Sequence, residues 1–214
     1  QSVVCPEERV EPAQVPYVKD PTKVMMTKNS RDAHVRVEQR TIDLIQYAET
    51  SGINRIEECA EGSLVNGKKI GVITSSTSYQ YTKEVFEDKV SVLKLGMVYP
   101  LPEKLIKDFA QGKDEIYVIE ELDPIIENHC KQLGIQVHGK DTFPICGEFS
   151  QNLIKKCMGM EEPEFTSIDA QIPGRPPVMC AGCPHRGIFY ILHKKKIMVY
   201  GDIGCYTLGA VAPA

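Results

Sequence analysis

The sequence predicts an α/β fold in which a parallel sheet is flanked by helices. Short apolar runs rich in β-branched residues begin at Ile70, Val90 and Glu115, and stretches with helical spacing separate them. Strands that alternate with helices of about ten residues form parallel sheets covered on both faces. With 214 residues, 42% of them hydrophobic and 25% charged, the chain has room for one large or two small globular domains.

The elements of this sheet unit follow one another with short connections. We expect strands at 70–74, 90–95, 115–120 and 135–138, and helices at 79–86, 103–109, 125–133 and 149–157. The hydroxyl side chains of Ser75–Ser78 are expected to cap the first helix, and Asp123 with Pro124 to begin the third. The segment Thr74–Ser78 can also bind an anion, but the glycines of a phosphate loop are absent, which favours capping.

The regions around this unit differ in composition. Prolines at positions 6, 12, 16 and 21 predict an extended connector over 1–28, and apolar spacing predicts an amphipathic helix over 31–50 that ends near Gly52. Prolines also mark a linker, and a strand is expected at 197–200. The expected divisions are a connector with a helix (1–60), an α/β domain (61–160), a linker (161–177) and the start of another α/β domain (178–214).

Charge and hydropathy limit the classes of partner. Lys and Arg total 25 against 29 Asp and Glu, a net charge of −4, which argues against sequence-independent nucleic-acid binding. No apolar run reaches the roughly 18 residues of a membrane span, and the start lacks a signal peptide, so we expect a cytoplasmic location. One predicted strand near the end cannot form a parallel sheet, and we therefore expect an internal piece of a longer polypeptide.

Cys180-Ala-Gly-Cys183 is the densest candidate for chemistry among eight cysteines. Two thiolates separated by two residues can face one soft metal, and Cys205, on a loop after the 197–200 strand, can supply a third. On spacing alone, the alternative of two packed thiols stays open.

Several polar residues have both a functional and a structural interpretation. His185 either contacts a cofactor or substrate, or lies at a helix start bonded to backbone. Arg186 either grips a carboxylate or phosphate, or is an exposed surface residue. Asp202 either lies at a cofactor or forms a turn. Glu120 and Glu121, at a strand end, either reach an active site or are solvated.

Two long strings carry a resemblance to a known family. Arg175-Pro-Pro-Val-Met-Cys-Ala-Gly-Cys-Pro-His-Arg-Gly187 and Tyr200-Gly-Asp-Ile-Gly-Cys-Tyr-Thr-Leu-Gly209 resemble the entry to the thiamine-diphosphate domain of the indolepyruvate ferredoxin oxidoreductase alpha-subunit family. The preceding unit, with Leu95-Gly-Met-Val-Tyr-Pro-Leu-Pro102 and Val118-Ile-Glu-Glu-Leu-Asp123, is similar to the transketolase C-terminal-like domain of the same family. The resemblance covers about 65–214.

This resemblance implies an activity for the complete enzyme. Aryl pyruvates, as small-molecule 2-oxoacids, are decarboxylated on thiamine diphosphate held with Mg²⁺, oxidised through iron–sulfur clusters to ferredoxin, and released as aryl-acetyl-CoA from coenzyme A. A beta subunit and ferredoxin are the implied partners, with no nucleic acid and no membrane. The family's Gly-Asp motif, which holds the diphosphate through magnesium, and the glutamate that activates the cofactor both lie outside this chain. The chain is therefore expected to be inactive alone.

The resemblance also implies roles for particular residues. Asp202, Gly204, Cys205 and His185 are the expected cofactor-binding residues, and Cys180, Cys183 and Cys205 the expected metal ligands. Two other functions remain open: another 2-oxoacid:ferredoxin oxidoreductase, or a non-catalytic interaction module whose CxxC binds a structural zinc.

Overall fold

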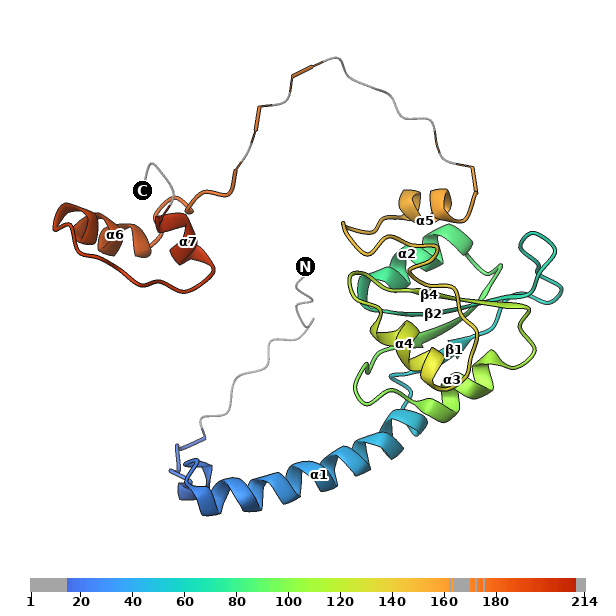
Figure 1. The fold of residues 1–214 in the computed structure, drawn as a ribbon, viewed down its shortest axis with the longest axis horizontal. Coiled ribbons are helices and arrows are strands. Elements are labelled where there is room, and N and C mark those ends of the chain that lie inside the picture. Colours follow the sequence, from blue (N-terminus) through green and yellow to red (C-terminus); the bar gives the residue numbers. More distant parts are fainter. Residues whose placement is uncertain (1–14, 162, 164–169, 172, 175, 211–214) are drawn as a thin grey trace. The chain divides into compact units, whose positions relative to one another are not determined.

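A computed structural model describes residues 15–161, 163, 170–171, 173–174 and 176–210, and the prolines at positions 6 and 12 of the expected connector lie outside them. The chain forms two compact units, Gln1–Pro163 and Glu164–Ala214 (Figure 1). The finer division into four parts expected from the sequence stays a prediction.

The first unit contains a sheet and the helices that pack on it. Its elements are η1 (Pro21–Lys23), α1 (Thr27–Thr50), β1 (Arg55–Glu57), β2 (Ile70–Ser75), α2 (Ser76–Phe86), β3 (Ser91–Leu95), α3 (Glu103–Ala110), β4 (Glu115–Ile119), α4 (Ile125–Gln132) and α5 (Gln151–Cys157). Strands and helices alternate from β2 to α4, which confirms the α/β class predicted from the apolar runs (Figure 1).

The sheet has the strand order β1-β3-β2-β4. β2 pairs with β3 and with β4 in parallel, as the sequence predicts, whereas the short edge strand β1 is antiparallel to β3. The predicted strand 135–138 is wrong as an element: a single parallel bridge joins His138 to Tyr117 on the outer edge of β4. Gly134 ends the preceding helix with a positive φ, and only His138 comes within reach of the strand.

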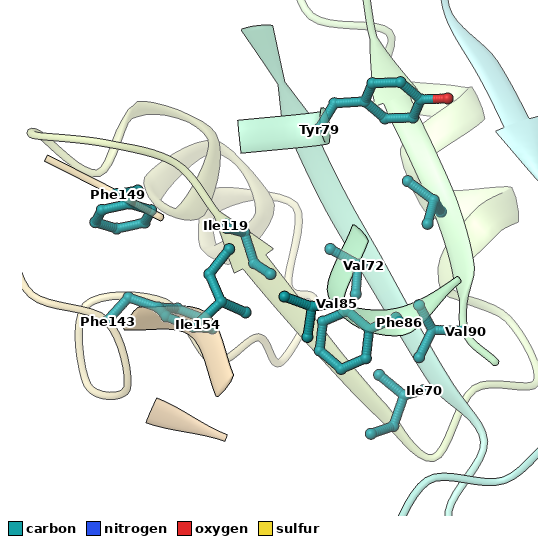
Figure 2. Close-up of a cluster of buried hydrophobic side chains, with 11 residues drawn as sticks. Ile70, Val72, Tyr79, Val85, Phe86, Val90, Ile119, Phe143, Phe149 and Ile154 are labelled. Carbon is teal, nitrogen blue, oxygen red and sulfur yellow. The ribbon is translucent and has the colours of Figure 1, made fainter. Parts of the chain in front are cut away.

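Two apolar clusters cover the two faces of the sheet. On one face, side chains of α2, α5 and the segment before α5, including Phe86, Phe143, Phe149 and Ile154, form a cluster with Val72 of β2 and Ile119 of β4 (Figure 2). On the other face, α3 and α4 pack on the alternate residues of the same strands; the members of that second cluster include Ile73, Leu93, Ile106, Phe109, Ile116 and Ile126. The period-2 alternation of strand side chains therefore supplies both faces of the core.

Carboxylates from outside the N-cap position cap two of these helices. Both oxygens of Glu49, in the last turn of α1, accept the amides of Lys104 and Leu105 at the start of α3, at 2.8 and 2.9 Å. Glu120 accepts two amides at the start of α4 in the same way. Negative charge at a helix start satisfies free amides and complements the helix dipole.

The capping expected from local sequence is therefore wrong at two helices. Ser75 occupies the N-cap position of α2 without a side-chain bond, and the N-cap of α4 is Pro124 instead of Asp123, also without one. α2 begins at Ser76, whose φ of +52° is unusual for a residue with a side chain. Among the described α-helices, only α5 has a local capping bond, in which Ser150 accepts the Leu153 amide at 3.2 Å; Asp20 caps the short helix η1 in the same way.

The second unit contains α6 (His185–Lys194) and α7 (Cys205–Gly209). The strand predicted at 197–200 is absent: these residues have no regular structure and no neighbouring strand in the described part of the unit to pair with. Over 176–210 no residue is fully buried, so these described residues form local structure without an apolar core.

None of the helices in the described ranges is both long and apolar enough to span a bilayer.

Candidate functional site

The CxxC segment folds as a tight turn. The amide of Cys183 donates to the carbonyl oxygen of Cys180 at 3.2 Å, closing a four-residue turn over Ala181 and Gly182. Gly182 has a φ of +73°, which is the value that a type II β-turn requires at its third position and that glycine adopts without strain. Cys180 is exposed and Cys183 half-buried, and both thiols are free.

Arg186 anchors this turn to the first turn of α6. Its Nε donates to the carbonyl oxygen of Cys180 at 3.0 Å, and its Nη2 donates to that of Met179 at 2.6 Å. These two main-chain bonds use the Nε–Nη2 edge of the guanidinium, while the Nη1–Nη2 edge makes no bond in the described residues. Arg186 therefore positions the turn in this structure.

An aromatic cluster joins α6 to α7. The His185 ring stacks on Phe189 with 6.0 Å between centroids, and Tyr206 lies 5.3 Å from His185 and 6.1 Å from Phe189. Gly209 allows the close approach of the two helices, because a Cβ there would lie 2.6 Å from the Phe189 ring. His185 thus packs against rings, and the backbone-bonded helix-start interpretation has no bond to support it in the described residues.

Beside this cluster the second unit has an open hollow of about 470 Å³. Its walls are mainly apolar and come from α6, the segment after it and α7; they include Phe189, Leu192, Ile197, Val199 and Tyr206. Asp202, His193 and Thr207 are polar residues of the same lining. Apolar walls with a few polar groups are typical of small-molecule and cofactor sites.

The expected cofactor residues occupy different places relative to this hollow. Asp202 lines it, and its carboxylate accepts the Ile203 amide at 2.8 Å, as in the turn interpretation, with lone pairs left for a ligand. Gly204 is the N-cap residue of α7 with a φ of +112°, and Cys205 is the first residue of that helix, not of a loop following a strand. Gly204, Cys205 and His185 are outside the lining of the hollow.

The three expected metal ligands do not converge. Within the described ranges, no group of three or more His, Cys, Asp or Glu residues is arranged to hold a metal ion. Cys180 and Cys183 are near each other through their turn, and Cys205 begins a separate helix. The assignment of these cysteines as metal ligands stays a prediction.

Glu120 and Glu121 accept main-chain amides within the fold, whereas the sequence predicted that they either reach an active site or are solvated. Glu120 is 8% exposed, and its two oxygens accept the amides of Ile126 and Glu127 at 2.9 and 3.0 Å. Burial raises the pKa of Glu120 above its ordinary value, and the amide bonds oppose this only in part. Glu121 accepts the Phe149 amide at 2.7 Å. Acidic residues between a buried strand and a helix start were the available signal for this capping role.

A second group of polar side chains lies at the other end of the strands, near the amino ends of β2 and β4. Lys68 forms an ion pair with Glu115, whose other oxygen accepts the Tyr117 hydroxyl at 3.0 Å. Burial and the bond to Glu115 raise the pKa of Tyr117 to about 12. His138 stacks on Tyr117, and its Nδ1 lies 3.0 Å from a carboxylate oxygen of Asp141. The group joins β4 to the segment after α4.

The chain is similar to curated relatives over both units, although no family model matches it. The indolepyruvate oxidoreductase subunit IorA of Pyrococcus abyssi is 36% identical over 68% of this chain, and that of Thermococcus kodakarensis is 32% identical over 92%. The IorA subunit of Methanothermobacter thermautotrophicus is 31% identical over 95%. The chain spans 26%, 34% and 36% of the length of these three relatives.

Among solved structures, a 2-oxoglutarate:ferredoxin oxidoreductase from Magnetococcus marinus is similar over 63% of this chain and 24% of its own, with 15% identity and a TM-score of 0.43. The sequence relationships are the stronger finding, because they include the CxxC turn and the glycine-rich segment before α7 within alignments of up to 97% of the chain. By sequence, this chain belongs to the indolepyruvate oxidoreductase subunit IorA family, and it spans 26–37% of the length of these relatives.

Proposed function

We propose that this chain is a part of an enzyme that oxidatively decarboxylates aryl pyruvates such as indolepyruvate to aryl-acetyl-CoA, with ferredoxin as the electron acceptor. The observation that carries the proposal is the relationship to IorA subunits over both units of the chain. A beta subunit, ferredoxin and coenzyme A are the proposed partners and co-substrate of the complete enzyme. The cytoplasm is its proposed location.

The first unit has a structural role in this proposal. Its side chains at the carboxyl ends of β2 and β4, where open α/β sheets commonly bind ligands, are engaged within the fold. Thr74 donates to the carbonyl oxygen of Ile119, and the carboxylates of Glu120 and Glu121 accept main-chain amides. With its polar groups bonded internally, this end of the sheet is suited to packing and not to catalysis. We therefore propose that the first unit, as a transketolase C-terminal-like domain, holds neighbouring domains in position.

The second unit supplies one wall of the proposed thiamine-diphosphate pocket. The apolar side chains of Phe189, Val199 and Tyr206 fit the flat rings of this cofactor, and Asp202 offers free acceptor lone pairs beside them. Thiamine diphosphate, when bound, supplies the electron sink that decarboxylation requires. In this chain, Asp202 would orient a polar edge of the cofactor, with Gly204, Cys205 and His185 behind the wall. The Mg²⁺ and diphosphate contacts would come from elsewhere in the complete enzyme.

Cys180, Cys183 and Cys205 are the proposed ligands of an iron–sulfur cluster. Their support is the two-residue spacing of the pair and the place of all three cysteines in one unit. The complete enzyme with Cys205→Ser should lose iron and slow electron transfer, whereas Cys146→Ser, at an exposed cysteine of the first unit, should not. Iron content and turnover equal to wild type in the Cys205 variant would remove Cys205 from the ligand set.

The direct test is the activity of the complete enzyme with its partner subunit. Ferredoxin reduction that depends on coenzyme A is measured with indolepyruvate, pyruvate and 2-oxoglutarate, and indolepyruvate should give the highest rate. A higher rate with another 2-oxoacid would reassign the substrate. Stoichiometric zinc with no iron after anaerobic reconstitution, together with no activity on any 2-oxoacid, would support the zinc interaction module instead.

A further inference from the structure

We propose that Cys180 and Cys183 form a reversible intramolecular disulfide, so that the CxxC turn is a thiol–disulfide exchange site. The proposal begins from the turn itself. The bond from the Cys183 amide to the Cys180 carbonyl and the positive φ of Gly182 define a closed turn whose first and last residues are the two cysteines. The inference does not depend on the proposed oxidoreductase activity.

This turn keeps the two cysteines within bridging distance. The first and last Cα atoms of a β-turn lie less than about 7 Å apart. Disulfides join residues whose Cα atoms are about 4.4–6.8 Å apart. Closing the bridge therefore needs side-chain rotation and only slight backbone adjustment.

Arg186 stabilises the turn in this conformation. Its bonds to the carbonyl oxygens of Met179 and Cys180 fix the residues on the amino side, while α6 begins two residues after Cys183. The cysteine pair is thus held between a helix start and a side chain of that helix. A pair held in this way pays less conformational entropy on closure than two cysteines in a free loop.

Exposure and the turn together distinguish this pair from the other described cysteines. Cys180 is open to solvent, so a disulfide reagent can reach it, and Cys183 is half-buried beside it. Cys130 is fully buried, and burial raises the pKa of its thiol to about 12, which leaves little reactive thiolate. Cys146 and Cys205 are exposed, but neither has a cysteine placed three residues away by a turn.

The exchange balances with a low-molecular-weight disulfide such as oxidised glutathione. The thiolate of Cys180 attacks one sulfur of that disulfide, forming a mixed disulfide and releasing one thiol. The thiolate of Cys183 then attacks the Cys180 sulfur, forming the internal bridge and releasing the second thiol. Two protein thiols are oxidised and one disulfide is reduced to two thiols. The oxidised pair has no thiolate left for a metal, so oxidation and metal binding exclude each other.

The test equilibrates the full chain, freed of metal with a chelator, in glutathione buffers of varied redox ratio. Reactions are quenched with acid and an alkylating agent, and peptide mass mapping identifies each cysteine. We expect an internal Cys180–Cys183 bridge, while Cys146 and Cys205 stop at the mixed disulfide with glutathione. A stable glutathione adduct on Cys180 at every redox ratio, or a bridge from Cys180 to Cys205, would overturn the proposal.

Two glycine variants separate a role of the turn from simple proximity in sequence. A Cβ at position 182 meets nothing within 4 Å, so Gly182→Ala changes the backbone preference without a clash. It should lower the equilibrium constant for closing the bridge by about fivefold, since residues with side chains disfavour the left-handed region. Gly187→Ala, equally free of contacts within α6, should leave that constant unchanged. Equal constants for the two variants would contradict the role of the turn.

A third variant tests the order of the steps. In Cys183→Ser the resolving thiol is missing, so the glutathione adduct on Cys180 should accumulate instead of the bridge. Absence of any adduct on Cys180 in this variant would show that the thiol is not accessible and would overturn the proposal.

Discussion

The two units of the chain contain similar side chains but bury them very differently. In the first unit, the fully buried residues Phe86, Ile106 and Ile154 lie between a sheet and helices on both of its faces. In the second, Ile188, Ile191 and Val199 belong to a helix or follow one, yet each is more than half exposed. Helices and turns are therefore encoded locally, whereas burial depends on partner strands, which only the first unit has in the described residues.

Removing a core aromatic side chain should sharpen this difference most. Phe86→Ala leaves a cavity between α2 and the sheet, and should lower the free energy of unfolding by about 3–5 kcal/mol. Phe189→Ala is the matched change in the second unit, where the ring is only half-buried, and should alter the main transition by less than about 0.5 kcal/mol. Urea unfolding followed by circular dichroism measures both.

Equal destabilisation by the two alanine variants would show that both units unfold as one cooperative structure. That result would contradict the contrast in burial.

Glu120→Gln should have the next largest effect. Glutamine has one acceptor oxygen, so one of the two buried amides at Ile126 and Glu127 loses its partner, at about 1–3 kcal/mol. Burial raises the pKa of Glu120 in the folded protein, so the folded state holds this proton more tightly than the unfolded state does. Its contribution to the free energy of unfolding therefore falls as the pH rises from about 4.5 through the raised pKa.

The measurement is urea unfolding at a series of pH values on either side of this window. In Glu120→Gln, the free energy of unfolding should fall less steeply with rising pH, because the contribution of Glu120 is missing. Glu148→Gln, at an exposed position, should keep the wild-type pH dependence. Identical slopes in wild type and Glu120→Gln would remove the buried carboxylate as the cause.

Leu122→Gly should have the smallest effect, and with the opposite sign. Leu122 has a φ of +60° and is 62% exposed, so its side chain strains the backbone and contributes little packing. Relief of the strain, offset by the greater freedom of glycine in the unfolded chain, should raise the free energy of unfolding by about 0.5 kcal/mol. Leu122→Ala removes the side-chain atoms beyond the Cβ but keeps the Cβ itself, and should give no such gain in thermal unfolding. A gain of equal size in both variants would rule out backbone strain.

Much of the first unit was predictable because its signals are local. The apolar runs at Ile70 and Glu115 are buried strands, and the spacing of Leu44 and Ala48 marks a helix. The short strand β1 was missed because Arg55–Glu57 contains two charged residues of three. Its pairing with β3 comes from tertiary context, which a local pattern does not contain.

Capping and the second unit show where local reasoning fails. Glu49 caps α3 from 55 and 56 positions away in the sequence, so no local motif marks it. The apolar run 197–200 has the composition of a strand, but an isolated strand has no partner for its backbone bonds. At the candidate site, the spacing of Cys180 and Cys183 was informative, whereas the anchoring role of Arg186 depends on a turn that spacing alone does not specify.

Native-state hydrogen exchange, read residue by residue by mass spectrometry or NMR, tests the contrast between the two units most directly. Amides of β2, β3 and β4 should exchange only through global opening, with protection that corresponds to most of the free energy of unfolding. Amides of α6 and α7 should exchange orders of magnitude faster, because no buried side chain holds either helix in the described unit. Comparable protection in α6 and in the central strands would contradict the account.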